Sequence, residues 1–467
     1  MPARNRRSLC NTLAYRAALC YNVHDIMKLR RKLSSFQIII IGFAAVILLG
    51  SLLLMLPFAT RDGRGASFFD SLFTATSAVC VTGLVVKDTA LYWSGFGQAI
   101  ILILIQIGGM GVVTLTVAFA MAAGKKINLK ERSTLREAIS APDFKGLVKL
   151  NGFIILGILI FELIGALVMM PSFIKAFGAG KGIWYSIFHS VSAFCNAGFD
   201  LMGERGEFSS LTSFAYDPLV NIPVMLLIII GGIGFVTWDD IRKNKWRFSR
   251  YRMQSKVVLT TTAILIFVPT LYYFFFEFGD LPFGKRLLVS LFQSVTPRTA
   301  GFNTVNLTAI SEAGLTLMMA LMLIGGSPGS TAGGMKTTTV AVLFANAFSV
   351  FRRKEQPQFF RRRAPEGIVR SAATIFIMYL VLFLLGGLII SKVENLPILS
   401  CLFETASAIG TVGLTLGITP ELGALSRCIL ILLMFFGRVG GLTLIFATLP
   451  GVRHNGAQVP QEKLTVG

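Results

Sequence analysis

Long and short apolar segments alternate along this chain in an order that occurs four times. The first segment of each set has 20 to 24 residues and few charges, at residues 36–56, 147–170, 257–276 and 371–391. An α-helix of this length crosses about 30 Å of hydrocarbon. Each is followed by an apolar stretch too short to cross, at residues 66–79, 183–194, 287–296 and 398–409, and then by a second long segment, at residues 96–122, 218–238, 315–350 and 427–449. The pattern predicts units of helix, re-entrant half-helix with an extended segment, and helix.

A similar motif closes each of the four short stretches. It follows a Phe, passes through small and hydroxyl residues, and ends on a glycine followed by Leu or Phe; the glycines are Gly83, Gly198, Gly301 and Gly413. Repetition at intervals of 115, 103 and 112 residues indicates four copies of one structural unit. Two spans per unit return the chain to its starting side, so all four units have the same orientation and can surround one axis. We therefore expect an all-α membrane protein with eight transmembrane helices and four re-entrant pore loops, in four parallel helix-loop-helix repeats around a pseudo-fourfold pore.

Composition and charge support a membrane protein and orient it. Hydrophobic residues make up 54% of the chain, charged residues only 14%, and the mean hydropathy is +0.70. The ends and the links between units hold 31 of the 44 basic residues but 9 of the 23 acidic ones. Since cytoplasmic loops concentrate Lys and Arg, we expect both termini in the cytoplasm and the glycine loops facing outward. The net charge of +21 also fits contact with anionic membrane lipid. Nucleic-acid binding is the lesser alternative, because the basic runs 352–354 and 361–363 lack a recognisable fold to present them.

The expected divisions of the chain follow from these patterns. They are a basic cytoplasmic tail (1–34), pore repeat 1 (35–123), a cytoplasmic link (124–146), pore repeat 2 (147–238), a link (239–256), pore repeat 3 with an intramembrane loop (257–351), a link (352–369), pore repeat 4 (370–450) and a cytoplasmic tail (451–467).

The four glycine loops are candidates for an ion path. Non-helical backbone at membrane depth is tolerated where it is buried in protein or lines water, and rings of carbonyl oxygens can replace the hydration shell of a monovalent cation. The loops carry no carboxylate, which disfavours selection of divalent ions. A helix-packing role for the glycines is the alternative. In the third loop, we expect Arg298 to point away from the path and bind loop carbonyls or an acid such as Glu404. At matching positions, His189 and Glu404 are expected to be hydrogen-bonded scaffold.

The second long segment of every unit contains a glycine-rich break, at residues 108–111, 231–234, 325–329 and 437–441. In the third unit, residues 315–350 would form a helix of about 54 Å, far longer than the bilayer requires. Residues 325–336 must interrupt it, and their irregular polar backbone should face the water path. Arg438 lies midway along an apolar helix, where a charge is costly unless it is paired or hydrated, so we expect it to face the cavity.

With these motifs, the chain resembles the Ktr/Trk/HKT potassium transporters, and most closely the membrane subunit of bacterial Ktr systems. The resemblance covers residues 35–450 and includes the run 296–304. It implies potassium uptake through a filter lined by Val81, Thr82, Gly83, Asn196, Ala197, Gly198, Thr299, Ala300, Gly301, Thr411, Val412 and Gly413. It implies a gate formed by Gly325, Gly326, Ser327, Pro328, Gly329, Ser330, Thr331, Ala332, Gly333, Gly334, Lys336 and Arg438.

The resemblance further implies a multi-pass protein of the bacterial plasma membrane that transports K+, with no covalent cofactor and with Na+ as a possible activator. It implies a homodimer on a cytosolic, KtrA-like ring of nucleotide-binding regulatory subunits. Two alternatives remain. A secondary carrier for another small ion or solute would need a binding site at the membrane midplane, where the sequence offers mostly glycines and Arg438. A membrane enzyme would need converging His, Asp or Glu residues, and only Glu162 lies clearly within a span.

Overall fold

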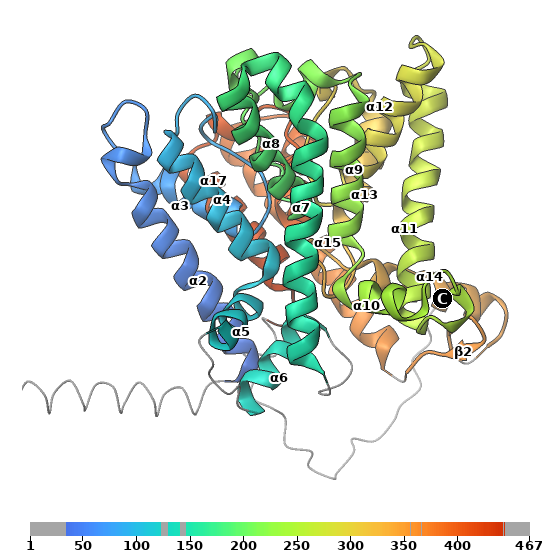
Figure 1. Cartoon of the computed structure of the whole chain (residues 1–467). Helices are drawn as coiled ribbons and strands as arrows, with labels where there is room; N and C mark the ends of the chain where they lie inside the picture. The colour runs from blue at the N-terminus through green and yellow to red at the C-terminus, as the bar shows by residue number, and fades with distance from the viewer. Residues whose placement is uncertain are drawn as a thin grey trace, which may run out of the picture.

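The computed structural model describes residues 34–122, 129–140, 146–354, 356–365, 367–441 and 443, and these are almost entirely helical (Figure 1). The predicted tails, residues 1–33 and 451–467, lie outside the described residues, as do parts of the first link. The α-helices are α2 (Ser35–Leu54), α3 (Phe68–Val79), α4 (Gly95–Met110), α5 (Val112–Ala122), α6 (Leu129–Ala138), α7 (Leu147–Phe177), α8 (Ala179–Phe194), α9 (Pro218–Gly232), α10 (Phe235–Asn244), α11 (Met253–Tyr272), α12 (Phe283–Val295), α13 (Glu312–Leu323), α14 (Thr337–Phe351), α15 (Ile368–Glu394), α16 (Ile398–Gly410) and α17 (Ala424–Val439).

Short elements connect these helices. They are the 3₁₀ turns η1 (Pro57–Ala59), η2 (Met202–Arg205), η3 (Ser210–Phe214), η4 (Phe248–Arg250), η6 (Leu307–Ala309) and η7 (Thr419–Glu421), the π-helical turn η5 (Tyr273–Glu277), and the strands β1 (Gln358–Phe359) and β2 (Arg362–Arg363). The two strands form an antiparallel hairpin.

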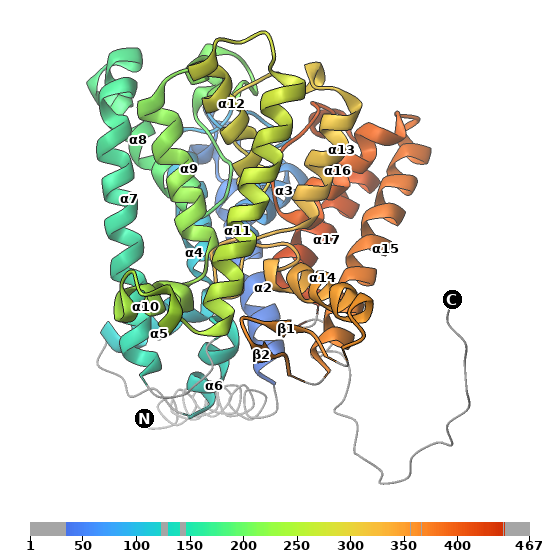
Figure 2. The same ribbon diagram turned by 90° about the vertical axis from the view of Figure 1, so that its right-hand side faces the viewer.

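Each repeat begins with a helix that is long and apolar enough to cross a membrane. In the described part of the chain these are α2, α7, α11 continued by η5, and α15, with the bent pair α9 and α10 as a possible fifth span. Figures 1 and 2 show α2, α7, α11 and α15 on four sides of the molecule. These four helices are largely exposed, since about a third or less of the most apolar stretch of each helix is buried inside the molecule. This is the pattern of helices that surround a protein interior and face lipid.

In repeats 1, 2 and 4, the second long segment breaks at a glycine, within the glycine-rich stretch that the sequence predicts as a break. Helix α4 ends at Gly111, α9 is followed by Gly234 and α17 ends at Gly440, all with φ between +83° and +89°. This backbone conformation favours glycine and ends a helix. The long segments 96–122, 218–238 and 427–449 are therefore interrupted within the predicted glycine-rich stretches 108–111, 231–234 and 437–441. Between α9 and α10 the chain turns by 95°.

The interior of the molecule is formed by the four short helices α3, α8, α12 and α16. Each packs against the long helix that precedes it in its own repeat. The C-terminal half of each is buried, including Phe73, Phe188, Phe292 and Phe403, the Phe residues that mark the repeated motif. These rings anchor the short helices inside the bundle, so the loops that follow are held at its centre.

Candidate functional site

The four glycine loops have the same backbone shape. In each, the motif glycine has a positive φ, and so does the residue two positions before it: Val81 and Gly83 (50° and 91°), Asn196 and Gly198 (58° and 67°), Thr299 and Gly301 (69° and 77°), and Thr411 and Gly413 (51° and 94°). Positive φ is uncommon for residues other than glycine and costly for a β-branched one. Three of the four non-glycine residues are β-branched, so the surrounding structure imposes this shape.

The four motif glycines form a closed cycle. A Cβ atom on each glycine would lie 2.6 Å or less from a carbonyl oxygen of the next repeat: Gly83 from Ala197, Gly198 from Ala300, Gly301 from Val412, and Gly413 from Thr82. Each glycine also lies against the Cα atom of the next glycine. The cycle returns to its first member, so the tertiary structure brings the four loops around one centre and leaves no space there for a side chain.

A Ser or Thr side chain anchors each loop. The repeated motif by itself did not identify this residue as an anchor. Ser77 and Ser407 accept hydrogen bonds from the amides of Gly83 and Gly413, at 3.1 and 2.9 Å. At the equivalent position, Ser192 and Thr296 donate to the carbonyls of Phe199 and Phe302, at 2.7 and 2.5 Å. The signal in the sequence is a Ser or Thr six residues before the glycine, or five in the third loop, which is one residue shorter.

The short helices also hold the chain beyond the glycines. His189 and Glu404 are fully buried and hydrogen bonded, as expected of scaffold. The imidazole Nε2 of His189 accepts from the amide of Leu201, and Glu404 accepts from the amide of Leu416.

Arg298 does not have the partners that the sequence suggested. Its guanidinium donates to the Thr262 hydroxyl on α11 at 3.5 Å, and not to loop carbonyls or Glu404. The side chain points away from the glycine cycle toward the outer helix of its own repeat, which fits a structural role.

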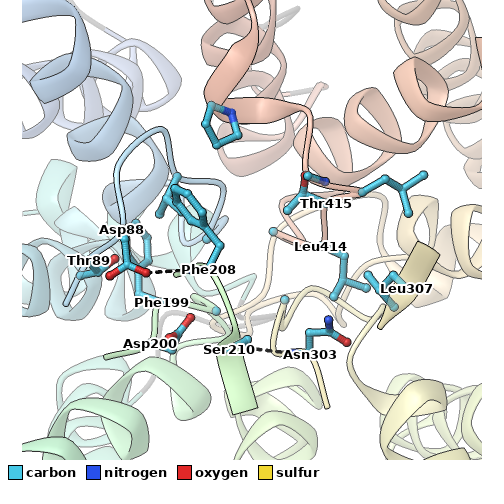
Figure 3. Close-up of a pocket in the computed structure, with 18 of the residues that line it drawn as sticks. Asp88, Thr89, Phe199, Asp200, Phe208, Ser210, Asn303, Leu307, Leu414 and Thr415 are labelled. Carbon is cyan, nitrogen blue, oxygen red and sulfur yellow. Dashed lines mark hydrogen bonds between the residues drawn. The ribbon is translucent and has the colours of Figure 1, made fainter. Parts of the chain in front are cut away.

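An open cavity of about 240 Å³ lies on one side of the glycine cycle. Besides the four glycines, it is lined by polar groups that follow them in the chain, among them Asp88, Asp200, Asn303 and Thr415 (Figure 3). The Asp88 carboxylate accepts from the Phe208 amide at 2.9 Å. Burial raises the pKa of Asp200 to about 7, and the charge of Asp88 contributes in the same direction.

Residues 325–336, predicted to interrupt the third repeat, form a loop between α13 and α14. The loop is tied to other repeats by its backbone: Ser327 donates to Gly232 at 2.9 Å, Thr331 to Gly231 at 3.2 Å, and Gly334 to Gly437 at 3.1 Å. The Thr331 hydroxyl donates to the Phe194 carbonyl at 3.0 Å, and Gly333 packs against Thr411. It therefore joins the breaks of repeats 2 and 4 and lies directly beneath their glycine loops.

Arg438 links this loop to repeat 1. Its guanidinium donates to the carbonyls of Thr331, Gly108 and Gly109. Lys336 donates to the carbonyls of Ala332 and Gly333, at 2.9 and 3.3 Å. Within the described part of the chain, neither side chain has a carboxylate partner. Carbonyl oxygens accept the hydrogen bonds of both cations, and the Arg438 guanidinium also lies 6.0 Å from the centre of the Phe43 ring.

A second cavity, of about 320 Å³, lies on the other side of the loop. Gly329, Ser330, Ala332, Gly334, Lys336 and Arg438 line it, together with residues that follow the helix breaks. No residue lines both cavities. The glycine cycle and the loop beneath it thus separate an outer cavity from an inner one.

Comparisons with known proteins agree with this architecture. The family described as "Cation transport protein" (TrkH) matches residues 3–451. The chain is 41% identical over 453 residues to the potassium/sodium uptake protein NtpJ of Enterococcus hirae, covering 94% of this chain and 99% of that one. It is 40% identical over 417 residues to the Ktr system potassium uptake protein B of Bacillus subtilis, covering 88% and 92%.

A solved structure has the same fold. The potassium transporter TrkH from Vibrio parahaemolyticus matches with a TM-score of 0.70 at 20% identity, over 89% of this chain and 84% of that chain. The members of this family are cation transporters, so the alternative of a membrane enzyme is excluded. From the match over nearly its whole length and its identity to the Ktr-system proteins, we conclude that the chain belongs to the TrkH/Ktr family of cation transport proteins.

Proposed function

We propose that this protein takes up potassium ions across the bacterial plasma membrane through a selective central pore. The observation that carries the proposal is the closed cycle of Gly83, Gly198, Gly301 and Gly413. Four uncharged loops of the same shape present main-chain oxygens around one centre, next to an open outer cavity. The names of two relatives support potassium as a transported ion: the Enterococcus hirae protein is a potassium/sodium uptake protein, and the Bacillus subtilis protein is a potassium uptake protein.

In the proposed architecture, eight helices cross the membrane and four re-entrant segments enter and return. The long helices α2, α7, α11 and α15 are the first spans, and the broken helices that begin with α4, α9, α13 and α17 are the second spans. Helices α3, α8, α12 and α16 end just before the glycine loops. Since the C-terminal end of a helix carries a partial negative charge, the four helix ends favour a cation at the centre.

The proposed filter consists of the three residues that end at each glycine: Val81, Thr82, Gly83, Asn196, Ala197, Gly198, Thr299, Ala300, Gly301, Thr411, Val412 and Gly413. Carbonyl oxygens in a ring can replace the water around K+. The contact of each glycine with a carbonyl of the next repeat supports a ring without lateral gaps.

The proposed gate is the loop 325–336 together with Arg438. An ion that leaves the filter toward the inner cavity meets Thr331 to Gly334, which lie beneath Phe194 and Thr411. Passage therefore requires the loop to move. Its ties to Arg438, Gly231 and Gly437 involve two other repeats, so a shift of the helix breaks can release it.

We also propose the assembly that the Ktr names suggest, a homodimer bound to a cytosolic ring of nucleotide-binding subunits, with Na+ as an activator. The link between α10 and α11 supports a cytosolic contact. Trp246 is 98% exposed and lies between Lys245 and Arg247. Its neighbour Phe248 packs on Phe360 at the β1–β2 hairpin, next to Arg361, Arg362 and Arg363. An exposed Trp among basic residues is suited to a partner surface.

Competition uptake with a Gly301→Ser variant tests the proposed filter. In potassium-uptake-deficient cells, the unaltered chain should restore growth at low K+ and take up K+ in preference to Na+. A side chain at Gly301 collides with the Val412 carbonyl at a φ of +77°, so the ring must deform and Na+ uptake should rise relative to K+. Gly284→Ser is the control in the same repeat, because nothing lies within 4 Å of its Cβ position. An unchanged ion ratio in Gly301→Ser would contradict the filter, and coupled transport of another solute would favour the secondary carrier.

A further inference from the structure

In three repeats, a polar side chain from the short helix binds the chain beyond the motif glycine. His189, Gln293 and Glu404 occupy the same position, nine residues before the glycine in repeats 2 and 4 and eight in the shorter loop of repeat 3. Each reaches the residue three positions past its glycine: Leu201, Thr304 and Leu416 respectively. We call His189, Gln293 and Glu404 the outer struts.

The three struts use different chemistry for the same contact. The Leu201 amide donates to His189 Nε2 at 3.4 Å, while His189 Nδ1 lies 2.7 Å from the Tyr185 carbonyl. The Gln293 amide donates to the Thr304 hydroxyl at 3.2 Å. All three struts are fully buried. An imidazole, an amide and a carboxylate thus reach the same point of the chain from the same position of the short helix. This indicates that the hydrogen bond is the common role of these side chains, and that a charge is not required for it.

Glu404 makes the most extensive of these contacts. One carboxylate oxygen accepts from the Leu416 amide at 3.2 Å and from the Thr415 hydroxyl, and the other accepts from the Thr419 hydroxyl at 2.7 Å. Thr415 and Leu416 line the outer cavity. The carboxylate therefore fixes the wall of the cavity immediately above Gly413.

The first repeat has no such strut. Thr74 occupies the position, and its hydroxyl is buried without a hydrogen-bond partner among the described residues. The segment after Gly83 is held from outside instead, by Asp88, which accepts from the amides of Ala90, Leu91 and Phe208.

We propose that the outer struts are positioning residues that set the selectivity of the filter between K+ and Na+. This inference rests on the proposed function of the glycine cycle as the filter. The hydroxyl anchors Ser77, Ser192, Thr296 and Ser407 hold each loop within its turn, and the struts hold the chain that leaves it. Carbonyls tied on both sides of the glycine cannot contract around Na+, which is smaller than K+. A loop released on its outer side can contract.

Substitution of Glu404 tests this inference in the full chain, by competition uptake of K+ and Na+. Glu404→Leu removes the acceptors of three hydrogen bonds, and the K+ preference should fall by at least roughly three- to tenfold, the range that the net worth of one such bond allows. Glu404→Gln keeps an acceptor oxygen for Leu416 and should retain most of the preference. If the carboxylate acted by its charge, Glu404→Gln would lose as much as Glu404→Leu, and the positioning role would be wrong.

Thr74→Val is the matched control at the same position of repeat 1. Its hydroxyl has no partner to lose, so the ion preference should not change. Thr419→Val removes one bond to Glu404 without altering the short helix, and it serves if Glu404→Leu reaches the membrane poorly. Thr419→Val should lower the preference for K+ over Na+ by a smaller factor than Glu404→Leu does.

The outcomes separate this inference from the filter itself. If Gly301→Ser changes the ion ratio while Glu404→Leu and Thr419→Val leave it unchanged, the filter stands and the strut proposal is overturned. If Thr74→Val reduces the preference as much as Glu404→Leu, the position matters for packing and not for the strut contact, and the proposal is again overturned.

Discussion

At the scale of single residues, the centre of this protein is formed by main-chain oxygens rather than by charged side chains. The carbonyl of the residue before each motif glycine faces the glycine of a neighbouring repeat, and the hydrogen bonds of Arg438 and Lys336 within the described part of the chain all go to carbonyls. The acidic groups Asp88 and Asp200 lie further out, in the wall of the outer cavity. In the proposed function, the main-chain oxygens select the cation and the acidic groups attract it.

Asp200 should make uptake depend on external pH. With a pKa of about 7, its carboxyl is neutral below pH 7 and charged above it. A unit charge ~8 Å from a cation in water contributes about 0.5 kcal/mol, a factor of roughly two in local cation concentration. K+ uptake at limiting external K+ should therefore rise about twofold between pH 6 and pH 8, and Asp200→Asn should abolish this rise.

Asp62→Asn is the control for this pH dependence. Asp62 lies outside the cavity, and hydrogen bonds from Thr60 and Arg64 lower its pKa, so it stays ionised throughout this range. The variant should keep the unaltered pH profile. A pH profile of Asp200→Asn that matches the unaltered chain would show that another group titrates.

Removal of Arg438 should favour the open state of the gate. Arg438→Gln loses charged hydrogen bonds to Thr331, Gly108 and Gly109, each worth about 1.5–3 kcal/mol. Basal K+ flux in vesicles without regulatory partners should increase roughly tenfold or more. Arg427→Gln is the control on the same helix, because Arg427 pairs with Asp70 and the Pro420 carbonyl, away from the loop. Lower flux in Arg438→Gln than in the unaltered chain would contradict this assignment.

At the scale of elements, the broken second helices bring the proposed gate close to the proposed filter. A Cβ on Gly108, Gly231 or Gly437 would collide with the carbonyl that ends the short helix of the same repeat, at Val79, Phe194 and Ile409 respectively. The third repeat differs, since Gly325 packs against Gly333 of its own loop. The glycine of each break thus permits close packing, and only the third break is expanded into a loop.

Gly231→Ala should destabilise the protein because its methyl group meets the Phe194 carbonyl and the Thr331 hydroxyl. Overpacking of this kind typically costs about 1–3 kcal/mol, so the thermal midpoint in detergent should fall by several degrees. Gly152→Ala in α7 is the control: nothing lies within 4 Å, and alanine favours a helix by about 1 kcal/mol over glycine. Equal midpoints for the two variants would contradict the close packing.

At the scale of the whole molecule, the elements that follow the helix breaks gather at one end. Figures 1 and 2 show α5, α6, α10, α14 and the β1–β2 hairpin at the end opposite to the first turns of α8 and α12. This end carries the basic links. In the proposed topology, this end is the cytoplasmic one for all four repeats.

Cysteine labelling tests this orientation. Trp246→Cys should react with an impermeant thiol reagent only from the cytoplasmic side, and Thr308→Cys only from outside, because Thr308 is exposed at the wall of the outer cavity. Both sites are placed in a chain whose native cysteines are replaced. Labelling of both from the same side would exclude the proposed path between the two cavities.

The sequence predicted the repeats well because the features that define each repeat lie close together along the chain. Apolar length, glycine and the preceding Phe are readable without tertiary information, and so is the interruption at residues 325–336. The partner of Arg298 was predicted wrongly, since Thr262 is one of many hydroxyls along an apolar helix. Gln293 was missed because an amide carries a weaker signal than the His and Glu at the same position.

The sequence by itself determined the membrane class, the four units, their common orientation and the positions that require glycine. These follow from hydrophobic length, charge asymmetry and the steric limits on backbone angles, all of which act along the chain. Only the tertiary structure decided that each glycine meets a carbonyl of the next repeat, that Arg438 joins the loop to repeat 1, and that the struts reach past the glycines. Such contacts join residues up to 331 positions apart, as between Gly413 and Thr82, and packing alone selects them.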